Sequence, residues 1–170
     1  MPSDAQRVVL SQAMLAVVSP DQRHARTLPT AVTFGGQIHS QALYLRFDPA
    51  WHRGTRIFGA FLLLEPMAGA PSATQNVTIS AWRIVDGWKP DNLRWLSQPR
   101  LGPPRGVGTA RAGGQSLLRI DVTDLVGYWQ DHPRHNYGIA LRASGSPGYG
   151  ATFATGAGGG QGPRLDVYYE

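Results

Sequence analysis

The chain has no cysteine, and its 170 residues include one lysine and two glutamates. The absence of cysteine excludes disulfide bonds, a thiolate nucleophile and any cysteine-ligated zinc site. Residues 8–14 form too short and too polar a stretch for the apolar region of a signal peptide. The longest apolar run, residues 57–64, is far below the roughly 18 to 20 residues that a membrane span requires. We therefore expect neither a secretory signal nor a membrane span.

Catalytic motifs are equally scarce. The sequence has neither the Gly-x-Ser-x-Gly elbow of hydrolases nor a His-Glu-x-x-His zinc motif. The glycine-rich stretch 156–162 lacks the lysine and the following helix of a phosphate-binding loop. His132 and His135 have no carboxylate or cysteine at a familiar ligand spacing, which predicts a surface loop. Since no pair of carboxylates is seen to converge as a glycosidase requires, we expect no enzymatic activity.

The chain is rich in arginine. The sequence has sixteen basic residues, all arginine except Lys89, and eleven acidic residues. The formal net charge is therefore +5, and the pI is near 10.1. The arginines are scattered along the sequence and form no block of like charge. Such a charge suits an acidic partner, for example a uronate, sulfate, phosphate or anionic lipid surface. Nucleic acid would require a recognisable motif or a denser basic cluster, so no nucleic-acid partner is expected.

Short apolar segments separated by Gly, Pro and Asp recur along the chain. This pattern is typical of a β-sandwich or barrel, and the chain is long enough to bury a core without disulfides. The sequence therefore predicts an all-β fold: a single domain over residues 1–170, an antiparallel, jelly-roll-like β-sandwich with one short helix. The expected strands are residues 8–18, 31–34, 42–47, 56–65, 77–85, 117–122, 137–142, 151–153 and 164–169.

Two of these regions lead to more specific expectations. Residues 42–47 alternate in polarity, with Tyr44 and Arg46 on the face opposite the aliphatic residues, which predicts a half-buried strand. Residues 106–114 are rich in glycine, and we expect them to form a flexible connector.

One segment, residues 123–130, has helical spacing of its apolar residues, with Asp121 or Thr123 as the N-cap. The carboxylates of Asp121 and Asp124 have two explanations. They stabilise the helix start through its N–H groups and dipole, or they bind calcium together with loop carbonyl groups. Calcium is the one cofactor that the sequence leaves open.

Several segments occur in an order that resembles a known family. They are residues 60–64, 88–95 with Gln98-Pro99, 121–126 with Trp129, 137–141 and 163–169. Over about residues 40–170 they resemble the DNRLRE family of β-sandwich domains, which is related to the disaggregatase-type carbohydrate-binding modules. The resemblance implies a jelly-roll-like sandwich, an extracellular or cell-surface context and polysaccharide binding, which is established for some members. The matching residues belong to the scaffold, so no binding residue is carried over.

Candidate binding residues come from loops. Trp88 and Trp95 could stack on sugar rings, although such rings more often plug the end of a sandwich. Trp51, Tyr149 and Phe153 lie in Gly- and Pro-flanked loops, so we expect them to be exposed and name them as ligand-binding aromatic residues. The cationic candidates, whose planar guanidinium groups pair with carboxylates, are Arg53, Arg56 and Arg142.

Two functions remain in competition. The first, ranked slightly ahead, is a non-catalytic carbohydrate-binding module for an acidic polysaccharide. The second is a structural subunit that assembles on a surface, filament or phage-like particle, with protein partners or as a homo-oligomer, through strand edges and loops. The first predicts a monomer with salt-sensitive glycan binding. The second predicts a concentration-dependent oligomer that is indifferent to glycans.

Overall fold

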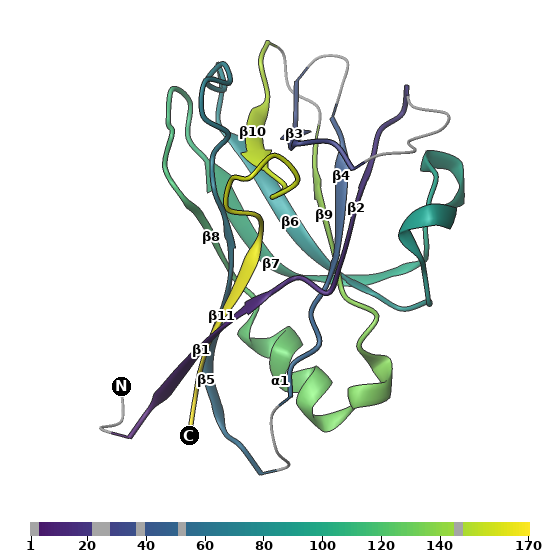
Figure 1. The fold of residues 1–170 in the computed structure, drawn as a ribbon, viewed down its shortest axis with the longest axis vertical. Helices are drawn as coiled ribbons and strands as arrows, with labels where there is room; N and C mark the ends of the chain where they lie inside the picture. Colours follow the sequence, from purple (N-terminus) through teal and green to yellow (C-terminus); the bar gives the residue numbers. More distant parts are fainter. Residues whose placement is uncertain (1–3, 22–27, 37–39, 51–53, 145–147) are drawn as a thin grey trace.

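The computed structural model describes residues 4–21, 28–36, 40–50, 54–144 and 148–170. In this part of the chain, eleven antiparallel strands form three open sheets, and there is a single α-helix, α1 (Thr123–Asp131) (Figure 1). The prediction of an all-β, sandwich-like fold with one short helix is therefore confirmed. The strands are β1 (Gln6–Ser11), β2 (Met14–Val18), β3 (Ala31–Phe34), β4 (Ala42–Arg46), β5 (Ile57–Leu64), β6 (Val77–Ile84), β7 (Leu101–Ala110), β8 (Leu118–Asp121), β9 (Ile139–Ala143), β10 (Ala151–Ala154) and β11 (Arg164–Tyr169).

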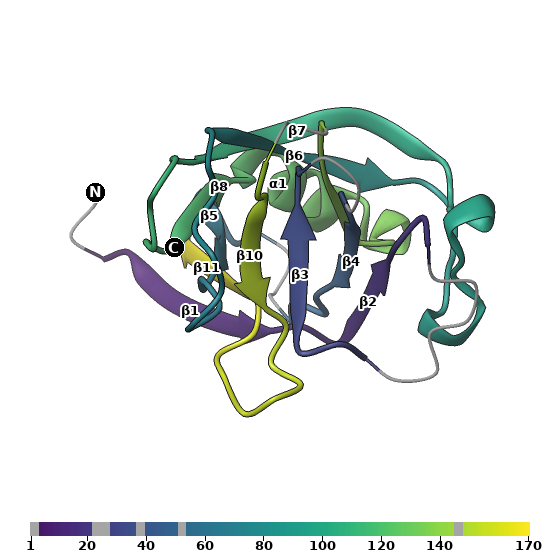
Figure 2. The ribbon, with the colours of Figure 1, turned by 90° about the horizontal axis from the view of Figure 1, so that it is seen from above.

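Two large sheets make the sandwich. One has the strand order β1-β11-β5-β8, and the other has the order β2-β4-β9-β6-β7. A two-stranded sheet, β10-β3, lies at the end of the sandwich that is uppermost in Figure 1, and Figure 2 shows the molecule from that end. The main core between these layers is mostly aliphatic and includes Leu45, Leu62, Ile79, Ile120 and Val167. Burial of this alternating apolar set is what fixes the register of the strands.

The segment expected as one strand over residues 8–18 is two strands in different sheets, so that prediction is wrong. β1 pairs with β11, whereas β2 pairs with β4. The apolar pattern changes phase between them, because Val8 and Leu10 pack against the core at even positions and Leu15 and Val17 do so at odd positions. A continuous strand keeps one phase, since its side chains alternate with a period of two.

Strand β4 is buried on both faces, not on one. Leu43 and Leu45 lie in the main core, and Tyr44 on the other face is also fully buried. Residues 86–100 cover the face of β4 that carries Tyr44. They contain the short 3₁₀ helices η1 (Pro90–Asn92) and η2 (Trp95–Ser97). They form a second core against the outer face of the five-stranded sheet. Its members are Ala16, Val18, Ala42, Tyr44, Ile84, Leu93 and Ala140, flanked by Trp82, Trp88, Trp95, Leu101 and Tyr137.

The glycine-rich residues expected as a flexible connector belong largely to strand β7. It pairs along its length with β6 and runs close to β8. A Cβ at Gly106 would overlap the carbonyl oxygen of Asp121, and one at Gly108 would lie 2.7 Å from Cγ1 of Ile120. These glycines therefore serve a close approach of two backbones, which is a use of glycine that composition does not distinguish from flexibility.

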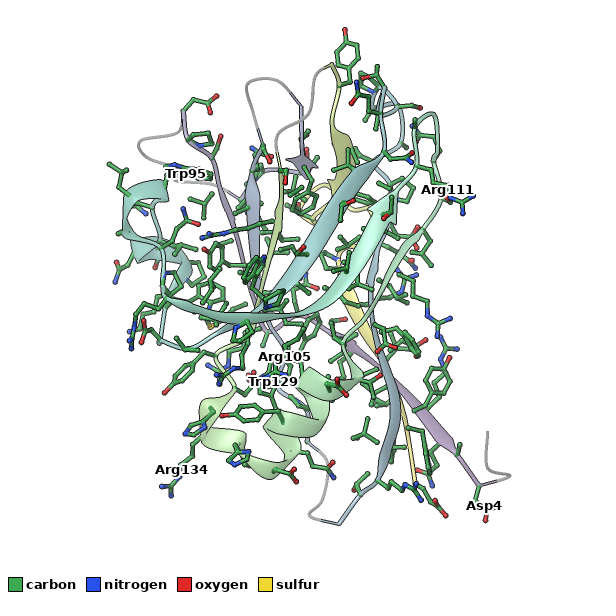
Figure 3. All side chains as sticks on the ribbon, turned by 180° about the vertical axis from the view of Figure 1, so that it is seen from behind. Asp4, Trp95, Arg105, Arg111, Trp129 and Arg134 are labelled. Carbon is green, nitrogen blue, oxygen red and sulfur yellow. The ribbon has the colours of Figure 1, made fainter. Side chains whose placement is uncertain are left out.

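The helix is confirmed within one residue of its expected end. Leu125, Val126 and Trp129 are the buried residues of α1, and Trp129 is directed toward the sandwich (Figure 3). None of the helices in the described ranges has the length and apolarity needed to span a membrane.

Candidate functional site

The structure does not bring the predicted ligand-binding residues together. Trp51 and Arg53 lie outside the described residues. Arg56 is exposed just before β5, where its guanidinium carbon lies 5.1 Å from the centre of the Phe58 ring. Tyr149 is exposed, as expected, but it precedes β10 at the opposite end of the sandwich (Figure 1).

The two other candidates are internal. Phe153 is 3% exposed and packs on Phe34 with ring centres 6.1 Å apart, because β10 closes the end of the core. The expectation that Phe153 is exposed is therefore wrong. Arg142 is half-buried, and its Nη2 donates to the Tyr44 hydroxyl (2.8 Å) and to Oε1 of Gln98 (2.5 Å). The guanidinium of Arg142 thus makes structural hydrogen bonds within the protein.

The carboxylate of Asp121 is occupied at the start of α1. Its Oδ1 accepts the backbone N–H of Thr123 at 2.9 Å and the Thr123 hydroxyl at 2.6 Å. The same hydroxyl accepts the N–H of Ala60, so the carboxylate ties the helix start to β5. Asp124 lies in the first turn of α1, where its negative charge interacts favourably with the helix dipole. The described residues contain no group of three or more His, Asp or Glu side chains that could hold a metal ion, and calcium binding stays a hypothesis.

A cleft opens within residues 86–100, the segment that covers the five-stranded sheet and carries Trp95 in Figure 3. Its volume is about 440 Å³, within the range typical of small-ligand sites. It lies wholly within residues 86–100, which bend back on themselves through η1 and η2. We call it the tryptophan cleft. Its lining residues are Gly87, Trp88, Lys89, Asn92, Leu93, Ser97 and Pro99.

Trp88 is held rigidly in this cleft. Its indole N–H donates to the carbonyl oxygen of Tyr137 at 2.7 Å. Its ring packs edge to face against the Tyr44 ring, with the ring centres 5.7 Å apart. The ring is half-buried, so it belongs to the second core and also lines the cleft. The packing role expected for Trp88 and Trp95 is thus confirmed, and for Trp88 it leaves part of the ring accessible. A fixed aromatic ring loses little entropy when a ligand stacks on it.

Three polar side chains in the cleft have no partner among the described residues. Lys89, Asn92 and Ser97 are exposed, and within the described ranges no hydrogen bond or ion pair engages their side chains. The segment has two acidic residues, Asp86, which is paired with Arg100 at 2.8 Å, and Asp91 in η1. Neither forms an ion pair with Lys89 within the described ranges, so the exposed ammonium group of Lys89 is a positive charge without an ion-pair partner there.

A clamp of three side chains fixes the outer wall of the cleft. The Tyr44 hydroxyl donates to Oε1 of Gln98 at 2.6 Å, and Arg142 donates to both groups. Nε2 of Gln98 in turn donates to the carbonyl oxygen of Trp95. Since Gln98 stands between two lining residues, Arg142 positions the cleft rather than binding in it.

This clamp makes a testable contribution to alkaline stability. Burial raises the pKa of Tyr44 above 10, an effect that Arg142 partly opposes. In the unfolded chain, Tyr44 therefore loses its proton at a lower pH than in the folded protein. The stabilising contribution of the protonated Tyr44 hydroxyl is complete below pH 10 and is lost as the pH rises. Tyr44→Phe removes this titration and two hydrogen bonds, and we expect it to cost about 1–2 kcal/mol at neutral pH. Urea unfolding at pH 7 to 11 measures both effects, and an equally steep alkaline decline in the variant would contradict this assignment.

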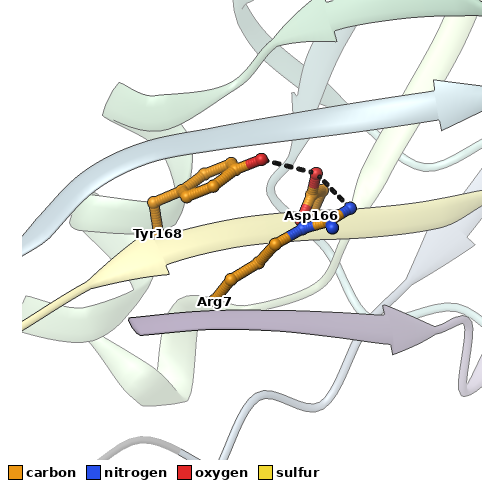
Figure 4. Close-up of polar contacts among 3 residues, drawn as sticks. All are labelled: Arg7, Asp166 and Tyr168. Carbon is orange, nitrogen blue, oxygen red and sulfur yellow. Dashed lines mark hydrogen bonds and ion pairs between the residues drawn. The ribbon is translucent and has the colours of Figure 1, made fainter. Parts of the chain in front are cut away.

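The outer face of the four-stranded sheet is a second surface that carries aromatic rings and arginines. There the carboxylate of Asp166 is buried and accepts from Arg7 at 2.7 Å and from the Tyr168 hydroxyl at 3.2 Å (Figure 4). The guanidinium carbon of Arg119 lies 3.5 Å from the centre of the Phe61 ring. The charge of Arg7 is thus neutralised by Asp166. Arg119 covers the face of the Phe61 ring on which a sugar would stack. We therefore assign this surface to stability.

Comparison with known proteins adds no relative. No protein-family model and no curated protein matches this chain. The resemblance to DNRLRE domains accordingly stays a prediction.

Sequence reasoning found Trp88 but missed its neighbours. The sequence did carry one signal, because the only lysine of the chain directly follows a tryptophan. Asn92 and Ser97 carried none, since whether a polar loop residue is free depends on how the loop folds back.

Proposed function

We propose that the protein is a non-catalytic carbohydrate-binding module, that the tryptophan cleft is its site and that its ligand is an acidic polysaccharide. The observation that carries this proposal is one fixed aromatic ring, Trp88, next to three polar side chains that have no partner in the described part of the chain. Binding sites of this kind combine an apolar wall with a few polar groups that set orientation.

The chemistry of each lining group fits a charged sugar. The ring of Trp88 offers an apolar surface for the C–H face of a pyranose, while Asn92 and Ser97 offer donors and acceptors for hydroxyl groups. The ammonium of Lys89 attracts a carboxylate or sulfate. The net charge of +5 favours approach of a polyanion over the whole surface.

The same lining supports binding without cleavage. It contains no Asp, Glu or His. Hydrolysis of a glycosidic bond uses a pair of carboxylates that flank it, one to protonate the leaving oxygen and one to activate water or attack carbon. The cleft has neither group.

A charge-matched pair of variants tests the proposal. Lys89→Gln and Arg56→Gln each remove one exposed positive charge, but only Lys89 lines the cleft. We expect Lys89→Gln to weaken binding of polygalacturonate about tenfold at low salt, which corresponds to about 1.4 kcal/mol, and Arg56→Gln to change it little. Titration calorimetry at low and high salt measures both, and Asn92→Ala supplies an uncharged change in the same cleft.

The outcomes separate the cleft from general charge attraction. Equal losses in the two charge variants, with no effect of Asn92→Ala, would assign binding to the net charge and not to the cleft. Wild-type protein that binds no member of a glycan array would overturn the module itself.

A further inference from the structure

Strand β1 differs from the other sheet edges of this molecule. The two large sheets end in β1 and β8 and in β2 and β7, respectively. A free edge exposes backbone N–H and C=O groups that can pair with another strand, and proteins usually cover or interrupt such edges.

Three of these four edges are protected. β7 runs so close to β8 that there is no room for a Cβ at Gly106. β7 itself contains Pro103 and Pro104, which have no N–H to donate. β2 is almost entirely buried, and η1 packs beside it.

The two-stranded sheet has no regular free edge either. On the β10 side, Met67 donates to the carbonyl of Thr152, and Ala154 donates to that of Glu65. On the β3 side, Gln41 donates to the carbonyl of Thr33 at 2.9 Å. Among the described residues, β1 is thus the edge strand that keeps a regular and exposed side.

The side chains of β1 do not discourage pairing. The strand has no proline and no lysine, and Arg7, its one charged residue, is neutralised by Asp166. Val9 is 47% exposed on the outer face of the sheet, while Val8 and Leu10 reach the margin of the main core. A second β1 strand would extend this core and would meet no unbalanced charge.

We propose that two copies of the chain pair through β1 as antiparallel strands around a twofold axis at Val9. The two four-stranded sheets then form one sheet of eight strands. In this register Val9 faces Val9 of the second copy, Val8 faces Leu10, and Arg7 faces Ser11. Outward residues meet outward residues, and each Arg7 is kept away from its equivalent. The contact is isologous, as a closed dimer requires.

This inference is independent of carbohydrate binding. Residues 86–100, which form the tryptophan cleft, lie on the outer face of the other large sheet and far from β1 (Figure 2), so pairing through β1 leaves the cleft open. A dimer would present two clefts, and a repetitive polysaccharide would then be held with greater avidity than by one cleft.

A disulfide trap tests the twofold axis directly. The chain has no cysteine, so Val9→Cys introduces the only thiol. Directly opposite residues in antiparallel strands have Cβ atoms about 4.5–5.5 Å apart, close to the 3.5–4.5 Å of a disulfide. Val107→Cys is the matched control, because Val107 is 58% exposed on edge strand β7. We expect mild oxidation to cross-link Val9→Cys in dilute solution and Val107→Cys far less, whereas equal cross-linking would overturn the proposal.

Sedimentation over a concentration series measures the equilibrium itself. We expect wild-type protein to form a discrete dimer, Val9→Arg to raise its dissociation constant at least about tenfold and Val107→Arg to leave it unchanged. Val9 is exposed, so its replacement leaves the core intact. A wild-type chain that stays monomeric over the whole series, or a dimer indifferent to Val9→Arg, would overturn pairing through β1.

Discussion

Replacing Gly138 with alanine is expected to lower the free energy of unfolding by about 3 kcal/mol or more. Gly138 has a φ of +99°, a conformation that residues with a Cβ rarely adopt. A Cβ there would overlap the carbonyl oxygen of Leu45, which lies on a strand buried on both faces. The residue stands directly before β9, in the middle of the five-stranded sheet, so neither backbone has room to move. Urea unfolding followed by tryptophan fluorescence measures the loss.

Gly127 supplies the opposite control. It lies within α1, has no atom near the position of a Cβ and does not have a positive φ. Gly127→Ala should therefore stabilise the protein by about 0.5–1 kcal/mol, since alanine loses less backbone entropy in a helix. Similar effects of the two substitutions would mean that the contact at Gly138 is not as described.

Truncation of Trp129 to alanine is the second large effect, with an expected cost of about 3–5 kcal/mol. The indole is 2% exposed and joins α1 to the main core with Leu125 and Val126. Its removal leaves a cavity larger than the surrounding strands can close, because they are held by hydrogen bonds in both sheets. The midpoint of urea unfolding should fall accordingly.

Trp129→Phe separates shape from polarity at this position. The indole Nε1 is buried and finds no hydrogen-bond partner among the described residues. Phenylalanine keeps much of the ring and removes this unsatisfied donor, so we expect it to cost less than half as much as alanine. A loss equal to that of Trp129→Ala would show that the N–H is bonded after all.

The strands could be predicted from local patterns where one face of a sheet is buried. β6, β9 and β11 fall close to their expected bounds, because apolar alternation is a local property of the sequence. The change of phase in the apolar residues also marks the break between β1 and β2, although the apolar composition of residues 8–18 alone favours one strand. The assignment of residues 1–170 to a single domain stays a prediction.

The burial of a residue by segments that are distant in the sequence could not be predicted. Tyr44 alternates like a surface residue, and only the fold of residues 86–100 places a second core over it. Phe153 is flanked by small residues like an exposed loop, yet pairing of β10 with β3 turns it inward. Tertiary contacts of this kind override local pattern.

The candidate site shows the same limit. The charge of Arg142 makes it a binding candidate in the sequence, but in the fold its guanidinium donates to Gln98 and Tyr44. By itself, a single exposed lysine such as Lys89 carries no site signal in the sequence. It gains meaning only beside a tryptophan that the second core holds in place.

The first and last strands of the chain are neighbours, with Gln6 opposite Tyr169 and both ends of the described chain on one side of the molecule (Figure 1). Because β1 and β11 run antiparallel, a pulling force applied through these ends would act across the strands. Their hydrogen bonds would then break one after another, like a zip, instead of sharing the load as they do when strands are sheared along their length. The protein should therefore yield at low force, beginning with the separation of β1 from β11.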